Sequence, residues 1–130
     1  MTGAAKRKGD AAEREVAALL TDLLGLPVRR KLGAGRQDDT GDLDGIPDTV
    51  VQVVNRRDLW VAMRLKPPAC EQQQANAGAT FGATAVRMVG GRWLFVLTPG
   101  QFAAYVKAVD NQGEFWDGDV PLGGDDMDGR

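Results

Sequence analysis

The first clear pattern in the chain is an apolar stripe with helical spacing near its beginning. Between residues 10 and 24, aliphatic side chains recur three and four positions apart, at Val16, Leu19, Leu20 and Leu23. Asp10 is a suitable N-cap, and Gly25 followed by Pro27 is typical of a helix end. We therefore predict a helix over residues 10–24, preceded by a frayed segment of small and basic residues.

Short runs typical of β-strands follow this helix. The strongest is residues 49–55, TVVQVVN, which has four valines in seven residues. Residues 33–41, GAGRQDDTG, are a loop by composition, and Gly90-Gly91 is a hairpin-turn dipeptide. We predict strands over residues 28–32, 42–46 (a strand or a turn), 49–55, 83–89 and 92–97.

Helical patterns return in the second half of the chain. Residues 58–66 are compatible with a helix, Pro67-Pro68 interrupts it, and residues 69–77 form the next helix. The last helix begins at Thr98-Pro99, an N-cap followed by proline at the first helical position. The resulting order, α-β-β-β-α-α-β-β-α, predicts an α/β domain with a mixed central sheet flanked by helices.

Charge is distributed unevenly along the chain. Residues 110–130 contain seven of the 18 acidic residues and one of the 16 basic ones, so residues 1–109 have a net charge of about +4. We predict a folded domain over residues 1–109 and an acidic, disordered tail over residues 110–130. A basic body favours an anionic partner, although the tail can equally serve solubility alone.

Missing residue types restrict the possible chemistry. The chain has no histidine, which excludes Ser-His-Asp triads, Cys-His dyads and histidine zinc sites. Cys70 is the single cysteine, so an internal disulfide is impossible. The aliphatic runs are too short to cross a membrane, and the first residues do not form a secretory signal. Carboxylates, amides, lysine and arginine remain, and their oxygens suit a hard metal ion.

Three polar positions are candidates for such a metal site. Glu13 lies on the opening helix, Asp42 lies beside a short strand, and Gln52 interrupts the valine-rich strand. Strand alternation puts Gln52 and Val54 on one face. A buried amide among valines needs a partner or a ligand. Carboxylates from Asp42 and Glu13 with the Gln52 side-chain carbonyl suit a divalent ion, which polarises a phosphate and generates hydroxide from water.

The order of these motifs is similar to a known nuclease superfamily. Residues 8–16, KGDAAEREV, resemble the KGxxxER opening helix of archaeal-type Holliday-junction resolvases. Asp42 followed by residues 51–55, VQVVN, resembles the D…(E/Q)xK core of the PD-(D/E)XK nuclease superfamily. Residues 86–102, VRMVGGRWLFVLTPGQF, are similar to the second half of small phage resolvases. The resemblance covers residues 6–109 and implies a restriction-endonuclease-like core.

The resemblance implies a role for each matching position. Asp42 corresponds to the central metal ligand, Gln52 and the Val53 backbone carbonyl complete the set, and Glu13 is the helix carboxylate that binds or orients Mg²⁺ (or Mn²⁺). Val54 departs from the pattern, because it stands where the family has its catalytic lysine. We expect Lys66 or Arg56 to supply the missing cation. Otherwise the protein is a catalytically impaired relative that acts as a DNA-binding or regulatory protein.

The resemblance also implies partners. Branched DNA is the expected substrate, cut by a homodimer in the cytoplasm of a bacterial or phage-infected cell during DNA recombination. Residues 6–8 form an expected mobile basic arm. The phosphates are expected to be bound by Arg29, Arg30, Lys31, Arg56 and Arg57.

Ordinary structural roles remain open for the same residues. Asp42 suits a turn, Gln52 can bond to backbone at a sheet edge, and Lys66 can simply end a helix. The basic residues can be solvated charge, and the chain can be a small interaction protein. We expect Gln72–Gln74 to form the exposed side of a helix. Trp60 and Trp93 are expected in the core.

Overall fold

The computed structural model describes residues 3–32, 39–55 and 58–114. Its elements, in chain order, are α1 (Gly3–Leu24), β1 (Arg29–Arg30), β2 (Leu43–Asp44), β3 (Thr49–Val54), α2 (Leu59–Ala77), β4 (Phe81–Arg87), β5 (Trp93–Val96) and α3 (Pro99–Glu114). The predicted α/β class with a mixed sheet is confirmed: β3 pairs with β4 in parallel, and β4 pairs with β5 antiparallel. β1 and β2 form a separate antiparallel pair.

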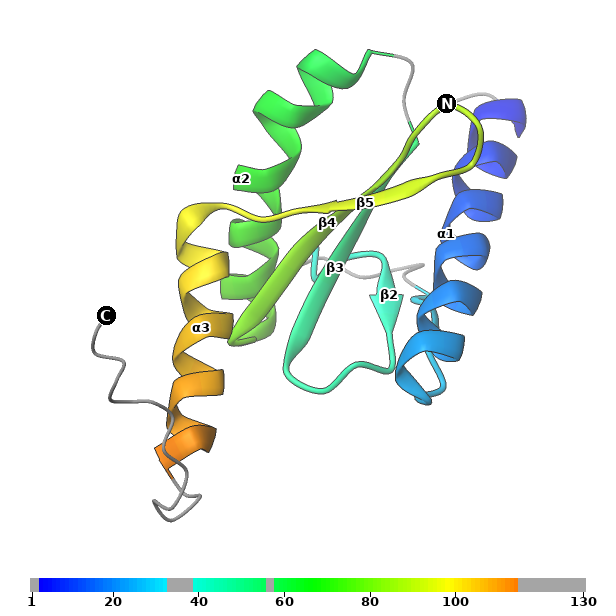
Figure 1. Ribbon diagram of the computed structural model, residues 1–130. Coiled ribbons are helices and arrows are strands. Elements are labelled where there is room, and N and C mark those ends of the chain that lie inside the picture. The colour runs from blue at the N-terminus through cyan, green and yellow to red at the C-terminus, as the bar shows by residue number, and fades with distance from the viewer. Residues whose placement is uncertain (1–2, 33–38, 56–57, 115–130) are drawn as a thin grey trace.

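The helices cover the two faces of the three-stranded sheet (Figure 1). On one face, an apolar cluster joins α1 with strand residues such as Val51 and Ala85. On the other face, Val54 and Val86 pack against Ala62 of α2. Successive side chains of β3 therefore alternate between α1 and α2, as strand geometry requires. Gln52 and Val54 share the α2 face, as the sequence predicts.

α2 is one continuous helix, so the predicted interruption at Pro67-Pro68 is wrong. Asp58 is its N-cap, accepting a hydrogen bond from the Val61 N–H (3.2 Å), and Gly78 ends it in the left-handed conformation. Each proline removes one helical hydrogen bond, but its fixed φ is compatible with a helix. Pro67 is also buried, and α2 packs on β3 and β4, so tertiary packing supports the helix across this point.

The ends of the terminal helices differ from the sequence prediction. α1 begins at Gly3, so residues 6–8 belong to a helix rather than to a mobile arm. α3 continues past residue 109 to Glu114, because no helix-breaking residue stops it where the acidic segment begins. Residues 115–130, which hold most of the predicted tail, lie outside the described residues. In the described part of the chain, no helix is both long and apolar enough to cross a membrane.

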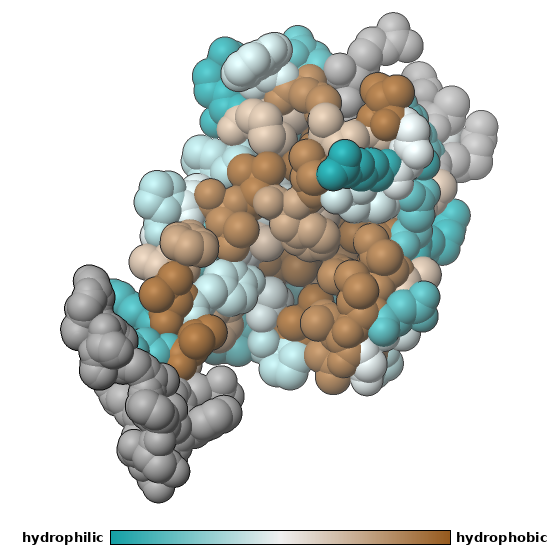
Figure 2. All heavy atoms as spheres, viewed as in Figure 1, coloured by the Kyte–Doolittle hydropathy of each residue, from teal (hydrophilic) through white to brown (hydrophobic). Residues whose placement is uncertain are grey.

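Trp60 and Trp93, both expected in the core, have different surroundings: Trp93 packs against the apolar cluster on the α1 face, and Trp60 is exposed. Trp60 is 85% exposed near the start of α2, which contradicts its expected place in the core. Trp93 is half-buried, and its indole N–H donates to Glu15 of α1 (2.8 Å). Figure 2 shows apolar residues gathered across the middle of the visible face. On β5, Leu94 and Phe95 are both exposed, although they point to opposite faces of the sheet.

Candidate functional site

Asp42 is held against the free edge of β3, opposite the edge that pairs with β4. Its backbone N–H donates to the Val51 carbonyl (2.9 Å), and its Oδ2 accepts from the Val53 N–H (2.8 Å). The preceding Gly41 has a φ of +98°, and a Cβ there would lie 2.7 Å from Val50 Cγ1. Glycine is therefore needed at this position for the chain to approach β3 closely enough.

Burial and neighbouring charge raise the pKa of the Asp42 carboxyl. Desolvation is the main cause, and the Asp39 carboxylate adds to it. The Val53 N–H opposes this effect most strongly, followed by the positive charges of Lys66 and Lys31. A carboxylate that is costly to keep ionised, with cationic groups nearby, has the electrostatic character of a functional group.

Glu13 of α1 lies within the electrostatic influence of Asp42. Burial raises the pKa of Glu13, and the Asp42 charge raises it further, while Arg30 opposes both. Arg30 pairs with Glu13 (Nε–Oε1, 3.3 Å) and with Asp10 (Nη2–Oδ1, 3.1 Å). The two predicted carboxylates therefore lie within electrostatic range of each other, and Arg30 is the counter-charge of Glu13.

Gln52 is buried on the α2 face, and both ends of its amide have protein partners. Its Nε2 donates to the Lys66 carbonyl (2.7 Å), and its Oε1 accepts from Gln73 Nε2 (2.8 Å). Gln73 was expected on the exposed side of the helix, but it is only 4% exposed. Its spacing of three residues from the buried Cys70 on one helix was the available signal.

Val54 and Lys66 lie in contrasting surroundings. Val54 is 2% exposed within the cluster that includes Ala62 and Val86, so its side chain is enclosed by apolar groups. Lys66 is half-buried on α2, and its charge acts on Asp42. Lys66 and Arg56 were the two residues expected to replace the family's catalytic lysine. Lys66 is electrostatically coupled to Asp42, and Arg56 lies outside the described residues.

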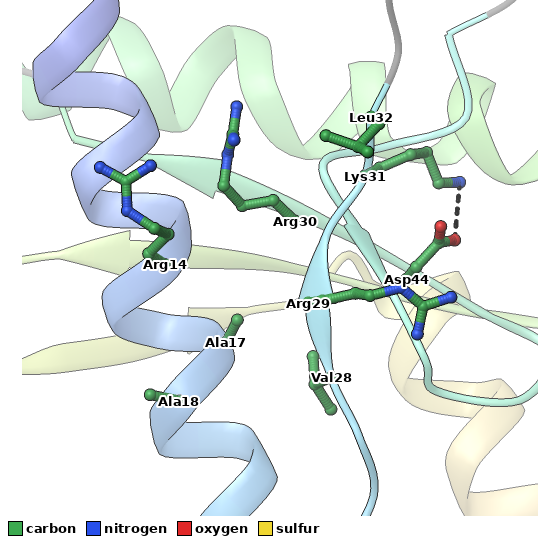
Figure 3. A pocket seen from close by; sticks show the side chains of 9 residues that line it. All are labelled: Arg14, Ala17, Ala18, Val28, Arg29, Arg30, Lys31, Leu32 and Asp44. Carbon is green, nitrogen blue, oxygen red and sulfur yellow. Dashed lines mark ion pairs between the residues drawn. The ribbon is translucent and has the colours of Figure 1, made fainter.

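The predicted DNA-binding segment lines a hollow of about 690 Å³ between α1 and the strand β1 (Figure 3). Arg29 is exposed there, whereas Arg30 is paired with Glu13 and Asp10 of α1. Lys31 pairs with Asp44 (3.6 Å) and donates to the Thr40 carbonyl (3.1 Å). Arg57, like Arg56, falls outside the described residues.

Arg14 also lines this hollow, and the sequence reasoning missed it. It lies one residue after Glu13 on α1, beside the small side chains of Ala17 and Ala18, which leave room for an entering group. Figure 3 shows Arg14 on α1, the helix beside the segment that carries Arg29 and Arg30. The available signal was the helical spacing from Arg14 to Ala17 and Ala18.

The donor set decides whether a metal ion fits this region. In the described parts of the chain, no group of three or more carboxylate, histidine or cysteine side chains is arranged to hold a metal. A metal would therefore need amide and main-chain oxygens besides Asp42 and Glu13. The Gln52 side chain has an amide oxygen, which lies on the α2 face and accepts from Gln73. The Val53 carbonyl faces the same strand edge as the Val53 N–H, and that N–H donates a hydrogen bond to the Asp42 carboxylate. Such an all-oxygen set suits Mg²⁺ or Mn²⁺.

Comparisons with protein-family models, with curated proteins and with solved structures gave no significant match.

Proposed function

We propose that this chain is a metal-dependent, structure-selective DNA endonuclease of the Holliday-junction-resolvase type, with a PD-(D/E)XK core. The supporting observation is the position of Asp42. Its carboxylate is half-buried at the free edge of β3, its pKa is raised, and it is electrostatically coupled to Glu13 of α1 and Lys66 of α2. A strand-edge carboxylate coupled to a helix carboxylate is the arrangement that the motif resemblance implies.

Four groups would hold the ion in this proposal: the Asp42 and Glu13 carboxylates, the Gln52 side-chain carbonyl and the Val53 backbone carbonyl. When bound, Mg²⁺ or Mn²⁺ polarises the scissile phosphate and lowers the pKa of a water molecule. The Val53 N–H orients Asp42 by occupying Oδ2. Arg30 neutralises Glu13 before the ion arrives, and it must share or release that carboxylate when the ion binds.

Lys66 is the cation in this proposal, because Val54 is enclosed by apolar side chains and has no charge to offer. The Lys66 ammonium already interacts with Asp42, so it acts in the same space as the proposed metal. A preorganised positive charge there stabilises the negative charge that develops on the phosphate during attack. Its carbonyl also anchors Gln52, so one residue of α2 serves both groups.

DNA would approach across the hollow that Arg14, Arg29 and Lys31 line. Its walls are basic, and Arg30 connects them directly to Glu13. Phosphates bound there would lie next to the carboxylate site, so backbone binding and catalysis are adjacent. Two symmetric cuts in a branched junction require a homodimer, which is the proposed active form.

A second candidate function, a catalytically impaired relative that binds DNA without cutting it, is favoured by two observations. The position of the usual lysine is a buried valine, Val54. Both ends of the Gln52 amide are also used inside the protein, so a metal must share its oxygen with Gln73. The basic hollow is unaffected by either feature.

A cleavage assay separates the two functions. Labelled four-way junction, flap and linear duplex would be incubated with Mn²⁺ and the natural protein, with EDTA as the negative control. For a nuclease, we expect EDTA to abolish cutting, and Lys66→Met to lower the rate about 10²–10³-fold. Lys107→Met is the matched control, because Lys107 is exposed on α3.

The outcomes differ clearly. Salt-sensitive junction binding without cutting would support the DNA-binding relative. Absence of both binding and cutting would refute both candidates and leave an interaction protein unrelated to nucleic acid.

A further inference from the structure

Gln73 contacts both segments that carry the proposed metal ligands. One of its amide hydrogens is donated to Gln52 Oε1 on β3 (2.8 Å), and the other is donated to Asp39 Oδ2 (2.9 Å). Asp39 in turn accepts from the Gly41 N–H through its other oxygen (3.0 Å), one residue before Asp42. A single side chain of α2 is therefore bonded to Gln52 directly and to the Asp42 segment through one carboxylate.

The direction of every bond in this chain is fixed. The Lys66 carbonyl can only accept, so the Gln52 NH₂ must face it and the Gln52 oxygen must face Gln73. The ionised Asp39 carboxylate can also only accept. A reversed Gln73 amide would put its oxygen against two acceptor oxygens. The observed orientation is thus the one that satisfies both neighbours.

The orientation of Gln73 is retained although it leaves one atom without a partner. Gln73 Oε1 is buried and has no hydrogen-bond partner among the described residues. An unpartnered buried oxygen is unfavourable and uncommon in folded proteins, and such atoms call for an explanation. An apolar side chain here would leave the buried Gln52 oxygen and one Asp39 oxygen without their donor, so the two donated bonds account for the amide and for its orientation.

Asp39 is itself fixed to α2 by a second bond. Asn76, three residues after Gln73, donates from Nδ2 to the Asp39 backbone carbonyl (2.8 Å). Residues three apart on a helix share a face, so Gln73 and Asn76 hold Asp39 by its side chain and by its backbone. The segment that leads into Asp42 is therefore attached to α2 at two points.

We infer that Gln73 and Asp39 form a positioning pair that sets the Gln52 carbonyl and the Asp42 carboxylate relative to each other. This inference rests on the proposed function, in which both groups bind the metal ion. Neither member of the pair touches the reacting atoms. Partners of this kind outside the ligand set commonly change metal affinity by about 10- to 100-fold when removed.

The test combines Mn²⁺ calorimetry with NMR of the metal-free protein. Gln73→Met keeps a long unbranched side chain but removes the amide, and Asp39→Asn removes one acceptor oxygen at an exposed position. Leu65→Met is the control for introducing methionine on this helix, because Leu65 is exposed on α2. We expect both test variants to weaken Mn²⁺ binding about tenfold or more, and the control to leave it unchanged.

A double-mutant cycle adds a readout that a merely structural role would not move. Because Gln73 acts partly through Gln52, Gln52→Ala and Gln73→Met together should weaken Mn²⁺ binding by clearly less than the combined effect of the two single variants. Fully additive losses, or unchanged Mn²⁺ affinity in the folded Gln73→Met variant, would overturn the inference.

The NMR measurement separates this inference from the proposed function. In metal-free protein, the Gln52 side-chain NH₂ signal should shift and lose protection from hydrogen exchange in Gln73→Met and in Asp39→Asn, but not in the control Leu65→Met. A natural protein that binds no Mn²⁺ would refute the proposed metal site, and the NMR signals would still report whether the pair orients Gln52. Unchanged Gln52 signals in both test variants would show that the pair has no positioning role.

Discussion

Substituting lysine for Val54 tests the most unusual feature of the site. The motif resemblance puts a catalytic lysine at this position, whereas the structure encloses Val54 among Ala62, Val86 and partly buried neighbours such as Met63. A lysine there has no exposed path in the described structure, since Val54 is 2% exposed. We expect Val54→Lys to destabilise the fold rather than to restore a catalytic group.

The magnitude follows from the burial of the charge. A fully buried lysine has its pKa lowered by roughly 3–5 units, and each unit corresponds to about 1.4 kcal/mol. At neutral pH the unfolded lysine is protonated, so folding with this group buried costs about 4 kcal/mol. Small domains are stable by only about 5–15 kcal/mol. The melting temperature should therefore fall by about 12 °C or more.

The assay is thermal unfolding followed by circular dichroism, with Val54→Met as the matched control. Methionine has a similar length and no charge, so the difference between the two variants isolates the ammonium from overpacking. Unfolding of Val54→Lys takes up a proton, so its stability should rise with pH and approach that of Val54→Met at alkaline pH. If the two variants melt within about 3 °C of each other at about pH 7, the side chain is not buried and the reasoning is wrong.

Three further outcomes are expected. In metal-free protein, Asp42→Asn should raise the melting temperature at neutral pH, because a carboxyl group whose pKa is raised by folding destabilises the fold when it is ionised. The gain should vanish in acid, where Asp42 is protonated, and equal melting curves at neutral pH would contradict the prediction. Arg29→Gln should weaken binding to every DNA sequence alike and reduce the slope of log affinity against log salt concentration by about one unit. An unchanged slope in a filter-binding assay would show that DNA does not contact this hollow. Gly41→Ala should lower the free energy of unfolding, measured in urea, by about 1–3 kcal/mol more than Gly78→Ala does. Both glycines have a positive φ, but of the two only Gly41 has other atoms within 4 Å of an added Cβ, so equal losses would mean that the clash at Gly41 is relieved.

Local structure was largely predictable from local sequence. The valine-rich run forms β3, and alternation correctly puts Gln52 and Val54 on one face. Gly90 and Gly91 both adopt positive φ in the turn between β4 and β5, where the Gly91 N–H donates to the Met88 carbonyl (3.0 Å) and the Met88 N–H donates to the Arg92 carbonyl (2.7 Å). These features depend on backbone dihedral preferences and on spacing, which neighbouring residues decide among themselves.

Local signals failed where packing opposed them. Pro67 and Pro68 are helix breakers by their own chemistry, yet α2 continues through them because Pro67 is buried. Trp60 is apolar enough for a core, but its position on α2 leaves it exposed. Sequence spacing gives the faces of an element without stating which face the rest of the fold will cover.

The candidate site was predictable in part. The absence of histidine, with carboxylates at positions 13 and 42, limits the chemistry to oxygen ligands on the basis of residue types alone. The fold adds the partners: Arg30 for Glu13, 17 residues away, and Gln73 for Asp39 and Gln52, 34 and 21 residues away. The sequence by itself determined which residue types were available and which strand face they occupied. Only the tertiary structure decided which of them meet, because hydrogen bonds and ion pairs between distant segments depend on how the helices pack on the sheet.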